Sequence, residues 1–340
     1  MSRKFKKKVK GAPAYLRDWI HTFRGGLTIV CLIILSIIPL LTQNSYHLGI
    51  FMTFMIFTIY ASSWDFLAGI VGQVSFGHAI FLGAAGYTTA YLVRYLSFPW
   101  WVALILGAIV AVLFGLIIGI PCLRLKGPYL ALGTLAMSLI MYQLFMMGTL
   151  AKEWEKTFGT QLFGAEGISQ IPPLDPNSVV EYFIIFLIMC LAVFFLTHIA
   201  KSNLGTILKA IRDDETGTSA SGINTTKYKI ISFVISGFFA GISGALFAFF
   251  FRGVNPGIFQ PLYSFQAIIM SALGGIATIS GSAIGALIYA LSTEFLRETQ
   301  DFNLLIFSII LILIIRFAEH GLLKPALERL KELWDILLGR

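Results

Sequence analysis

The chain has 340 residues, of which only 12% are charged, and it carries a formal net charge of +8; its mean hydropathy is +0.83. Soluble domains carry about twice that charged fraction, so the composition excludes a soluble globular protein and indicates an integral membrane protein. The positive charge does not indicate nucleic-acid binding, because eight of the 25 lysine and arginine residues lie within the first 24 positions.

Residues 1–26 form a basic tail in which Asp18 is the one acidic residue. Basic segments beside a first membrane span stay on the cytoplasmic side, where they are attracted to anionic lipid. The competing interpretation is a cleavable signal peptide, but the basic region is too long and Gln43-Asn44-Ser45 is not a small-residue cleavage site. We therefore expect a cytoplasmic tail.

Ten apolar runs follow along the chain, and because they are continuous and do not alternate, they predict helices rather than barrel strands. They cover residues 27–42, 48–67, 79–93, 99–121, 129–150, 182–200, 229–251, 262–277, 280–296 and 303–317. We predict an all-α polytopic membrane protein with about ten transmembrane helices and both termini in the cytoplasm. Short runs such as 262–277 also suit re-entrant helices, so the count lies between nine and eleven.

The loops between these runs differ in charge as the positive-inside rule requires for ten helices. The predicted inner segments are the basic tail, 121–128, 201–228 and the C-terminal tail, and all are rich in lysine and arginine. The predicted outer segment, 151–181, has two lysines but five acidic residues. This asymmetry supports the predicted orientation.

A polar patch with closely spaced glycines lies between the second and third runs. Its candidate pathway-lining residues are Gly72, Gln73, Ser75, Gly77 and His78. Irregular backbone at membrane depth is tolerated only where it is buried in protein or lines a cavity. Helix packing explains most other glycines of this chain, whereas this patch predicts non-helical backbone beside a transport pathway.

The stretch Lys201–Lys229 is the only long, strongly polar stretch between two apolar runs that also has helix-forming order. Asn203-Leu204-Gly205 breaks the incoming span, residues 206–211 read as a short helix, and Arg212-Asp213-Asp214-Glu215 reads as a charged turn or helix start. Gly222 reads as a helix stop. We predict a helix, a turn and a second helix on which a soluble partner docks; the alternative is a solvated loop that only sets topology.

Few ionisable residues fall inside the runs, and Asp65, His78 and Glu294 are the candidates. An intramembrane charge is a functional candidate by default, but these three lie near the predicted mouths, and Asp65 suits a helix cap. The sequence has no phosphate-binding glycine loop, paired metal ligands or nucleophile–base constellation, and its three cysteines lack paired spacing. We therefore expect no catalytic residue, metal or cofactor in this chain.

Several of these motifs occur together in one known family. Gly72-Gln-Val-Ser-Phe-Gly-His-Ala-Ile-Phe81, followed by Gly86-Tyr-Thr88, resembles the signature of LivM-type permeases of branched-chain amino acid ABC importers. The sequence from Lys209 to Glu215, and Gly222-Ile-Asn224 with Tyr228-Lys229, resemble that family's cytoplasmic coupling loop. Further matching positions are Leu273-Gly-Gly275, Gly281, Gly285 and Gly321-Leu-Leu323. The resemblance covers residues 27–325.

The resemblance implies a heteromeric importer that contains a second permease subunit, two ATP-binding cassette subunits and an extracytoplasmic solute-binding protein. ATP and Mg²⁺ would then bind to the ATPase subunits, which the loop at 201–229 would receive. The docking residues that this implies are Arg212, Asp213, Glu215 and Gly222. The loop departs from the general importer pattern of Glu-Ala-Ala followed by glycine, because Thr216-Gly217 follows Glu215.

We therefore predict a multi-pass permease subunit of the bacterial cytoplasmic membrane that lines the pathway, couples to separate ATPases and is not itself an enzyme. Branched-chain amino acids are the expected substrates. Importers of urea or short amides have closely similar permeases and are one alternative; a stand-alone secondary transporter is another, which the scarcity of mid-span charges disfavours. The expected divisions are a basic tail at 1–26, a transmembrane domain at 27–318 and an amphipathic cytoplasmic tail at 319–340.

Overall fold

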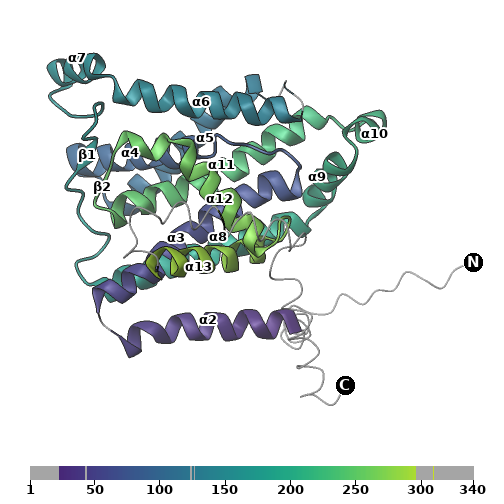
Figure 1. Cartoon of the computed structure of the whole chain (residues 1–340), viewed down its shortest axis with the longest axis horizontal. Coiled ribbons are helices and arrows are strands. Elements are labelled where there is room, and N and C mark those ends of the chain that lie inside the picture. The colour runs from purple at the N-terminus through teal and green to yellow at the C-terminus, as the bar shows by residue number, and fades with distance from the viewer. Residues whose placement is uncertain (1–22, 43, 123–124, 126, 296–308, 310–340) are drawn as a thin grey trace, which may run out of the picture.

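The computed structural model describes residues 23–42, 44–122, 125, 127–295 and 309. Long helices run side by side through it, and one short strand pair lies at one end (Figure 1). The longer helices are α2 (Phe23–Leu41), α3 (Ser45–Asp65), α4 (Ala79–Leu96), α5 (Trp100–Cys122), α6 (Pro128–Met146), α8 (Ser178–Lys201), α11 (Thr225–Phe250), α12 (Pro261–Gly274) and α13 (Ile279–Phe295). The strands β1 (Ile168–Ser169) and β2 (Gly253–Val254) pair in antiparallel fashion. The expected run 303–317 lies outside the described residues, apart from residue 309.

Five helical segments among the described residues are long and apolar enough to cross a membrane: Ser45–Ile70, α5, α6, α8 and α11. The pair α12 and α13 adds a sixth span if it counts as one, and the pair is bent by 110° at the break between its two helices. The prediction of an all-α polytopic membrane protein is confirmed at this level. The count of ten helices stays a prediction.

Helix α3 lies at the centre of the bundle, where it packs against α8, α11, α12 and α13. Every residue from Phe54 to Asp65 is buried. A helix that is buried all round is enclosed by protein rather than lipid. Its C-terminal end continues as a π-helical turn, η1 (Phe66–Ile70), and a non-helical stretch then leads to α4.

The expected span at 129–150 is shorter in the structure, because α6 ends at Met146 and Met147 is extended, with φ −65° and ψ 109°. A separate helix with a charged face, α7 (Gly148–Phe158), begins directly afterwards. Figure 1 places α7 and both strands at one end of the bundle, and α9 (Asn203–Asp213) and α10 (Glu215–Ala220) at the other. The acidic segment 151–181 and the basic segment 201–228 therefore lie at opposite ends.

Candidate functional site

The expected coupling loop folds as two short helices at the end of the bundle away from α7 (Figure 1). Helix α9 begins after Ser202, whose Oγ accepts a hydrogen bond from Gly205 N at 3.4 Å. Helix α10 begins after Asp214, whose Oδ1 accepts one from Gly217 N at 2.9 Å. Beyond α10, Gly222 has φ +84°, a left-handed conformation that favours glycine. The predicted helix–turn–helix is confirmed.

Glu215 anchors α10 to the bundle through an ion pair. Its Oε2 lies 2.6 Å from Lys229 Nζ, near the start of α11. The Lys229 side chain is only 5% exposed, whereas that of Glu215 is 37% exposed. A buried ammonium group needs a paired charge, so this contact fixes the second helix of the loop to a long membrane helix.

Arg212 anchors α9 in a similar way, but to the π-helical turn η1. Its Nη1 donates a hydrogen bond to the carbonyl oxygen of Gly69 at 2.8 Å, and its Nε and Nη2 each donate to Asp213 Oδ1 at 3.0 Å. Its aliphatic stem lies over Gly72, where an added Cβ would come within 2.8 Å of Arg212 Cγ. Gly72 also has φ +77°. The structure thus brings together one residue from each of the two predicted site regions.

Two of the expected docking residues, Arg212 and Glu215, have partners within this chain. These contacts position the loop, and the docking role of both residues stays a prediction. Asp213 remains a docking candidate because its side chain is 67% exposed, and Gly222 is exposed with no atom within 4 Å of an added Cβ. The sequence did not identify Lys229 as the partner of Glu215, because the two residues are 14 positions apart and no local pattern links them.

The glycine patch is non-helical from Gly72 to Gly77. Hydroxyl groups from other helices accept hydrogen bonds from the patch and from the start of α4: Thr134 of α6 accepts from Phe76 N at 3.0 Å, and Ser264 of α12 accepts from Ala79 N at 2.9 Å. Such partners are what irregular backbone needs at membrane depth. These hydrogen bonds therefore connect α6 and α12 to the segment at the start of α4.

The structure separates the five pathway candidates into two groups. Gly72 is exposed and Gln73 is half-buried, whereas Ser75, Gly77 and His78 are buried within the chain. Gly77 lies so close to the backbone of Thr134 that an added Cβ would collide with the Thr134 carbonyl group. In this conformation Ser75, Gly77 and His78 hold the backbone in place. Of the five candidates, only Gly72 and Gln73 are accessible at the surface of the molecule.

His78 sits in an enclosed polar and aromatic cluster. Its Nε2 lies 2.9 Å from Ser63 Oγ, and its ring packs against those of Tyr60 and Phe81 at centroid distances of 5.1 and 5.2 Å. The side chain has no exposed surface. This arrangement suits packing between α3 and α4, and among the described residues no three His, Cys, Asp or Glu side chains gather as metal ligands would.

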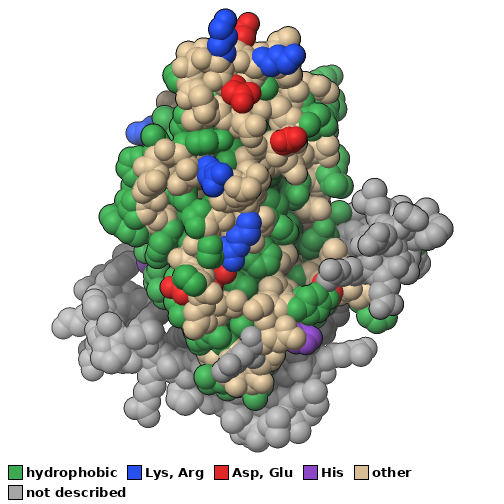
Figure 2. Space-filling view, turned by 90° about the vertical axis from the view of Figure 1, so that its left-hand side faces the viewer, with side chains coloured by type: hydrophobic (Ala, Val, Ile, Leu, Met, Phe, Trp, Pro, Cys, Tyr) green, Lys and Arg blue, Asp and Glu red, His purple; other side chains and the backbone are tan. Residues whose placement is uncertain are grey.

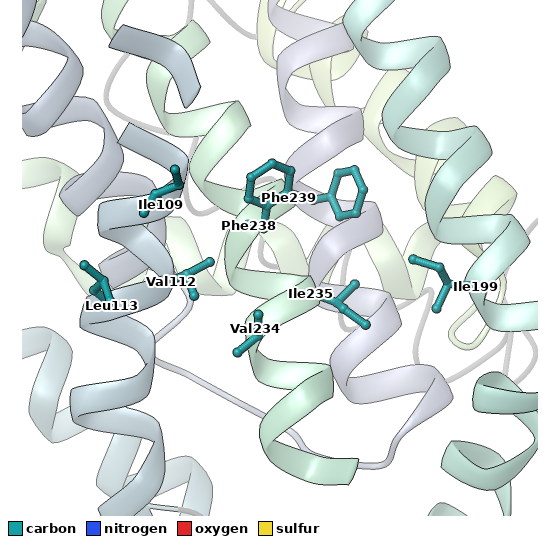
Figure 3. A pocket seen from close by; sticks show the side chains of 8 residues that line it. All are labelled: Ile109, Val112, Leu113, Ile199, Val234, Ile235, Phe238 and Phe239. Atoms are coloured by element: carbon teal, nitrogen blue, oxygen red, sulfur yellow. The ribbon is translucent and has the colours of Figure 1, made fainter. Parts of the chain in front are cut away.

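A separate cavity of about 330 Å³ opens between α5, α8 and α11 (Figure 3). Its lining consists of Ile109, Val112, Leu113, Ile199, Val234, Ile235, Phe238 and Phe239. All of these side chains are hydrocarbon, so the cavity offers no side-chain hydrogen bond to a polar ligand. None of the sequence-predicted site residues lines it.

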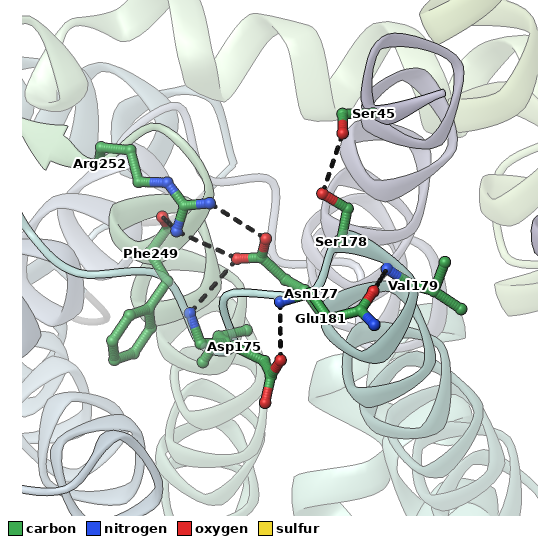
Figure 4. A network of polar contacts seen from close by, with 9 residues as sticks. Ser45, Asp175, Asn177, Ser178, Val179, Glu181, Phe249 and Arg252 are labelled. Carbon is green, nitrogen blue, oxygen red and sulfur yellow. Dashed lines mark hydrogen bonds and ion pairs between the residues drawn. The ribbon is translucent and has the colours of Figure 1, made fainter. Parts of the chain in front are cut away.

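At the α7 end, an ion pair fastens the segment before α8 (Figure 4). Arg252 donates from Nη1 and Nη2 to the two carboxylate oxygens of Glu181 at 3.2 and 3.1 Å. Leu174 N also donates to Glu181 Oε1 at 3.4 Å, and Ile171 N donates to the Arg252 carbonyl oxygen at 3.1 Å. Two-pronged pairing of this kind is strong and directional, so it holds this end of the molecule in one shape.

The surface of that end carries few charges, and they are of both signs (Figure 2). On α7 the exposed charged residues are Lys152, Glu153, Glu155 and Lys156. The opposite face of α7 packs through Trp154, whose ring lies 5.6 Å from that of Phe163. This end therefore presents a fixed, mixed-charge surface.

The sequence matches the family model for the permease component of branched-chain amino acid transport systems over residues 46–315. The high-affinity branched-chain amino acid transport permease LivM of Salmonella typhimurium is 26% identical over 96% of this chain and 82% of its own length. LivM of Escherichia coli is 26% identical, over 91% and 77%, and BraD of Pseudomonas aeruginosa is 30% identical, over 43% and 48%. No solved structure gives a significant match.

Proposed function

The chain belongs to the family of permease components of branched-chain amino acid transport systems, and we propose that it forms part of the membrane pathway of an importer that takes up branched-chain amino acids. It is a multi-pass membrane protein and a transport subunit rather than an enzyme. The relatives that cover most of its length are named as permeases for these amino acids. Their names support the choice of substrate.

The observation that carries the proposal is the anchored pair of helices α9 and α10. ATP-driven import requires a soluble motor to move membrane helices, and a slack loop would lose that movement. Arg212 and Glu215 hold the two helices to η1 and α11, at 2.8 and 2.6 Å. A motor that presses on the exposed residues around Asp213 would therefore move the bundle itself.

The partners that follow from this proposal are a second permease subunit, two ATP-binding cassette subunits and an extracytoplasmic solute-binding protein. ATP and Mg²⁺ belong to the ATPase subunits. The fixed surface around α7 and the Glu181–Arg252 pair is where the binding protein would deliver substrate. A rigid receiving surface lowers the ordering cost of docking.

The proposed topology is ten crossings in the bacterial cytoplasmic membrane, with both termini in the cytoplasm. The expected divisions at 1–26, 27–318 and 319–340 belong to it, although the two tails lie outside the described residues or extend beyond them. The placement of segments 151–181 and 201–228 at opposite ends supports this orientation (Figure 1). In this topology Gly72 and Gln73 lie at the inner mouth of the pathway.

A substrate panel tests the proposal. The whole complex, purified with its ATPase subunits and reconstituted into liposomes, is supplied with its binding protein and with labelled leucine, isoleucine, valine, urea or acetamide. We expect uptake of the three amino acids and none of the two amides. Uptake of urea or acetamide alone would show that the chain belongs to a urea or short-amide importer instead. Failure of the ATPase subunits to co-purify would contradict the ATP-driven mechanism.

A further inference from the structure

We propose that Asp65 and Gly69, in and just beyond the last turn of α3, transmit movement of the coupling loop to the bent helix pair α12–α13. This inference rests on the proposed function, because it concerns how a push on α9 reaches the membrane helices. It assigns both residues a positioning role in transport. Three successive contacts, from Arg212 through Gly69 and Asp65 to Ala277, carry it.

The first contact joins the coupling loop to η1. Arg212 Nη1 donates to Gly69 O at 2.8 Å, and the arginine stem lies over Gly72. A π-helical turn is rare and is often found at functional sites. Here α9 contacts the π-helical turn, so a displacement of α9 bears directly on η1.

The second contact joins η1 to Asp65 and to the turn between α12 and α13. Gly69 fits between them so closely that an added Cβ would collide with both Asp65 Oδ1 and the backbone of Ala277. Asp65 Oδ1 accepts a hydrogen bond from Ala277 N at 2.7 Å. Gly69 therefore touches the coupling loop through its carbonyl oxygen and the α12–α13 turn through its Cα.

The third contact is the hydrogen bond between Asp65 and Ala277, which lies in the turn between α12 and α13. Ala277 has φ +66° and Gly275 has φ +101°, so the turn contains a left-handed conformation that alanine disfavours. The hydrogen bond that Ala277 N donates to Asp65 Oδ1 helps to hold that conformation. A turn that depends on one buried contact can change its geometry when the contact moves, and the 110° angle between α12 and α13 depends on this turn.

Asp65 has a second acceptor oxygen that its hydrogen bond to Ala277 does not use. Its side chain is fully buried, and its second oxygen, Oδ2, accepts no hydrogen bond from the described residues. A buried carboxylate with a free acceptor is costly. That oxygen can accept another backbone N–H when the turn shifts, which lets Asp65 hold the turn in two arrangements.

The test measures leucine uptake per ATP hydrolysed by the reconstituted whole complex. Asp65→Ala removes the acceptor for Ala277 N, and Arg212→Met removes the donor to Gly69 while keeping the aliphatic stem. We expect each to lower uptake per ATP several-fold while the ATPase subunits stay bound. Asp65→Asn should restore only part of the ratio, because its amide oxygen can still accept from Ala277 N whereas its NH2 group cannot act as the second acceptor.

Ser62→Ala is the matched control. Ser62 Oγ donates to Ile279 O at 3.3 Å, so this variant also removes a buried hydrogen bond between α3 and the α12–α13 pair, but away from the path from Arg212. Its ratio should stay near that of the wild type. The double variant Asp65→Ala with Arg212→Met should be no worse than the poorer single variant, because both interrupt one path.

Equal loss of the ratio in Ser62→Ala and Asp65→Ala would overturn the proposal, as would an unchanged ratio in Asp65→Ala. If Asp65→Ala does not assemble, the Arg212→Met variant alone tests the proposal, because the Arg212 side chain is 36% exposed and its replacement should be tolerated. A normal ratio of uptake to ATP hydrolysis in Arg212→Met would contradict the role of the contact between Arg212 and Gly69. Loss of ATPase binding or of all uptake by the wild-type complex would instead contradict the proposed function.

Discussion

Lys229 shows how much one residue contributes to the coupling loop. It lies within the long helix α11, its ammonium group is buried, and its charge is compensated by Glu215 at 2.6 Å. Solvent reaches Glu215, so the pair contributes less than a fully buried one, about 1–2 kcal/mol. Its main effect is therefore to fix α10 in place relative to α11.

A charge exchange tests this pair. Glu215→Lys should weaken association with the ATPase subunits, because two ammonium groups would repel each other at the base of α10. The double variant Glu215→Lys with Lys229→Glu should recover part of that association, since opposite charges face each other again. Co-purification of the ATPase with each permease variant provides the measurement, and equal binding by all three proteins would show that the pair does not hold the loop.

Gly222 tests the loop through its backbone alone. Its φ is +84° and an added Cβ meets nothing within 4 Å, so Gly222→Val costs about 1 kcal/mol or more through conformation rather than through a clash. We expect Gly222→Val to insert normally but to lose ATPase association or coupling. Gly222→Asn should behave nearly like the wild type, because asparagine tolerates the left-handed region. A normal Gly222→Val variant would contradict a structured docking surface.

Gly77 tests the glycine patch through close packing. Gly77→Ala would bring a methyl group into the Thr134 carbonyl group, and overpacking of this kind costs about 1–3 kcal/mol. We expect a lower melting temperature in detergent and less assembled protein. Gly148→Ala is the control, because no atom lies within 4 Å of its added Cβ. Equal melting temperatures for both variants would show that α6 does not pack against the patch as described.

At the scale of helices, the sequence predicts what local signals encode. Asp214 and Gly222 mark the start of α10 and the end of the loop, and both lie where such residues cap helices. The break after Met146 was missed because the surrounding residues form one apolar run. The π-helical turn at Phe66–Ile70 was missed for the same reason, since hydropathy does not distinguish one type of helix from another.

Side-chain contacts between residues far apart in the chain are not predictable from one sequence. The contacts of Arg212 with Gly69 and of Arg252 with Glu181 join residues 143 and 71 positions apart. Such contacts form only when the helices that carry them have packed. The sequence predicted the two short helices after α8 and the irregular backbone around Gly77, and the structure has both there. Only the structure shows that Arg212 lies over Gly72.

The opposite placement of two segments allows a direct test of orientation. Ser169 and Ser221 are both exposed, and they lie at the two ends of the bundle (Figure 1). In a background without Cys31, Cys122 and Cys190, Ser169→Cys should react with a membrane-impermeant thiol reagent added to intact cells. Ser221→Cys should react only after the membrane is opened. The reverse pattern would place the coupling loop outside and contradict ATPase docking there.

At the scale of the whole molecule, ion pairs and hydrogen bonds hold both ends of the bundle. The Glu181–Arg252 pair fastens the segment beside α7, whereas α9 and α10 project from the other end and are tied to η1 and α11. Between them α3 runs through the centre of the bundle and contacts the bent pair α12–α13. This arrangement suits a permease whose inner end is driven by another subunit.

The ATP-dependence of uptake shows most directly whether this chain works as a subunit of an ATP-driven importer. Liposomes that contain the whole complex, with the binding protein outside and either ATP or a non-hydrolysable analogue at the ATPase side, are given labelled leucine. We expect uptake with ATP, none with the analogue, and none when this chain is reconstituted alone under an ion gradient. Uptake by the chain alone, or equal uptake with ATP and with the analogue, would contradict an ATP-driven mechanism.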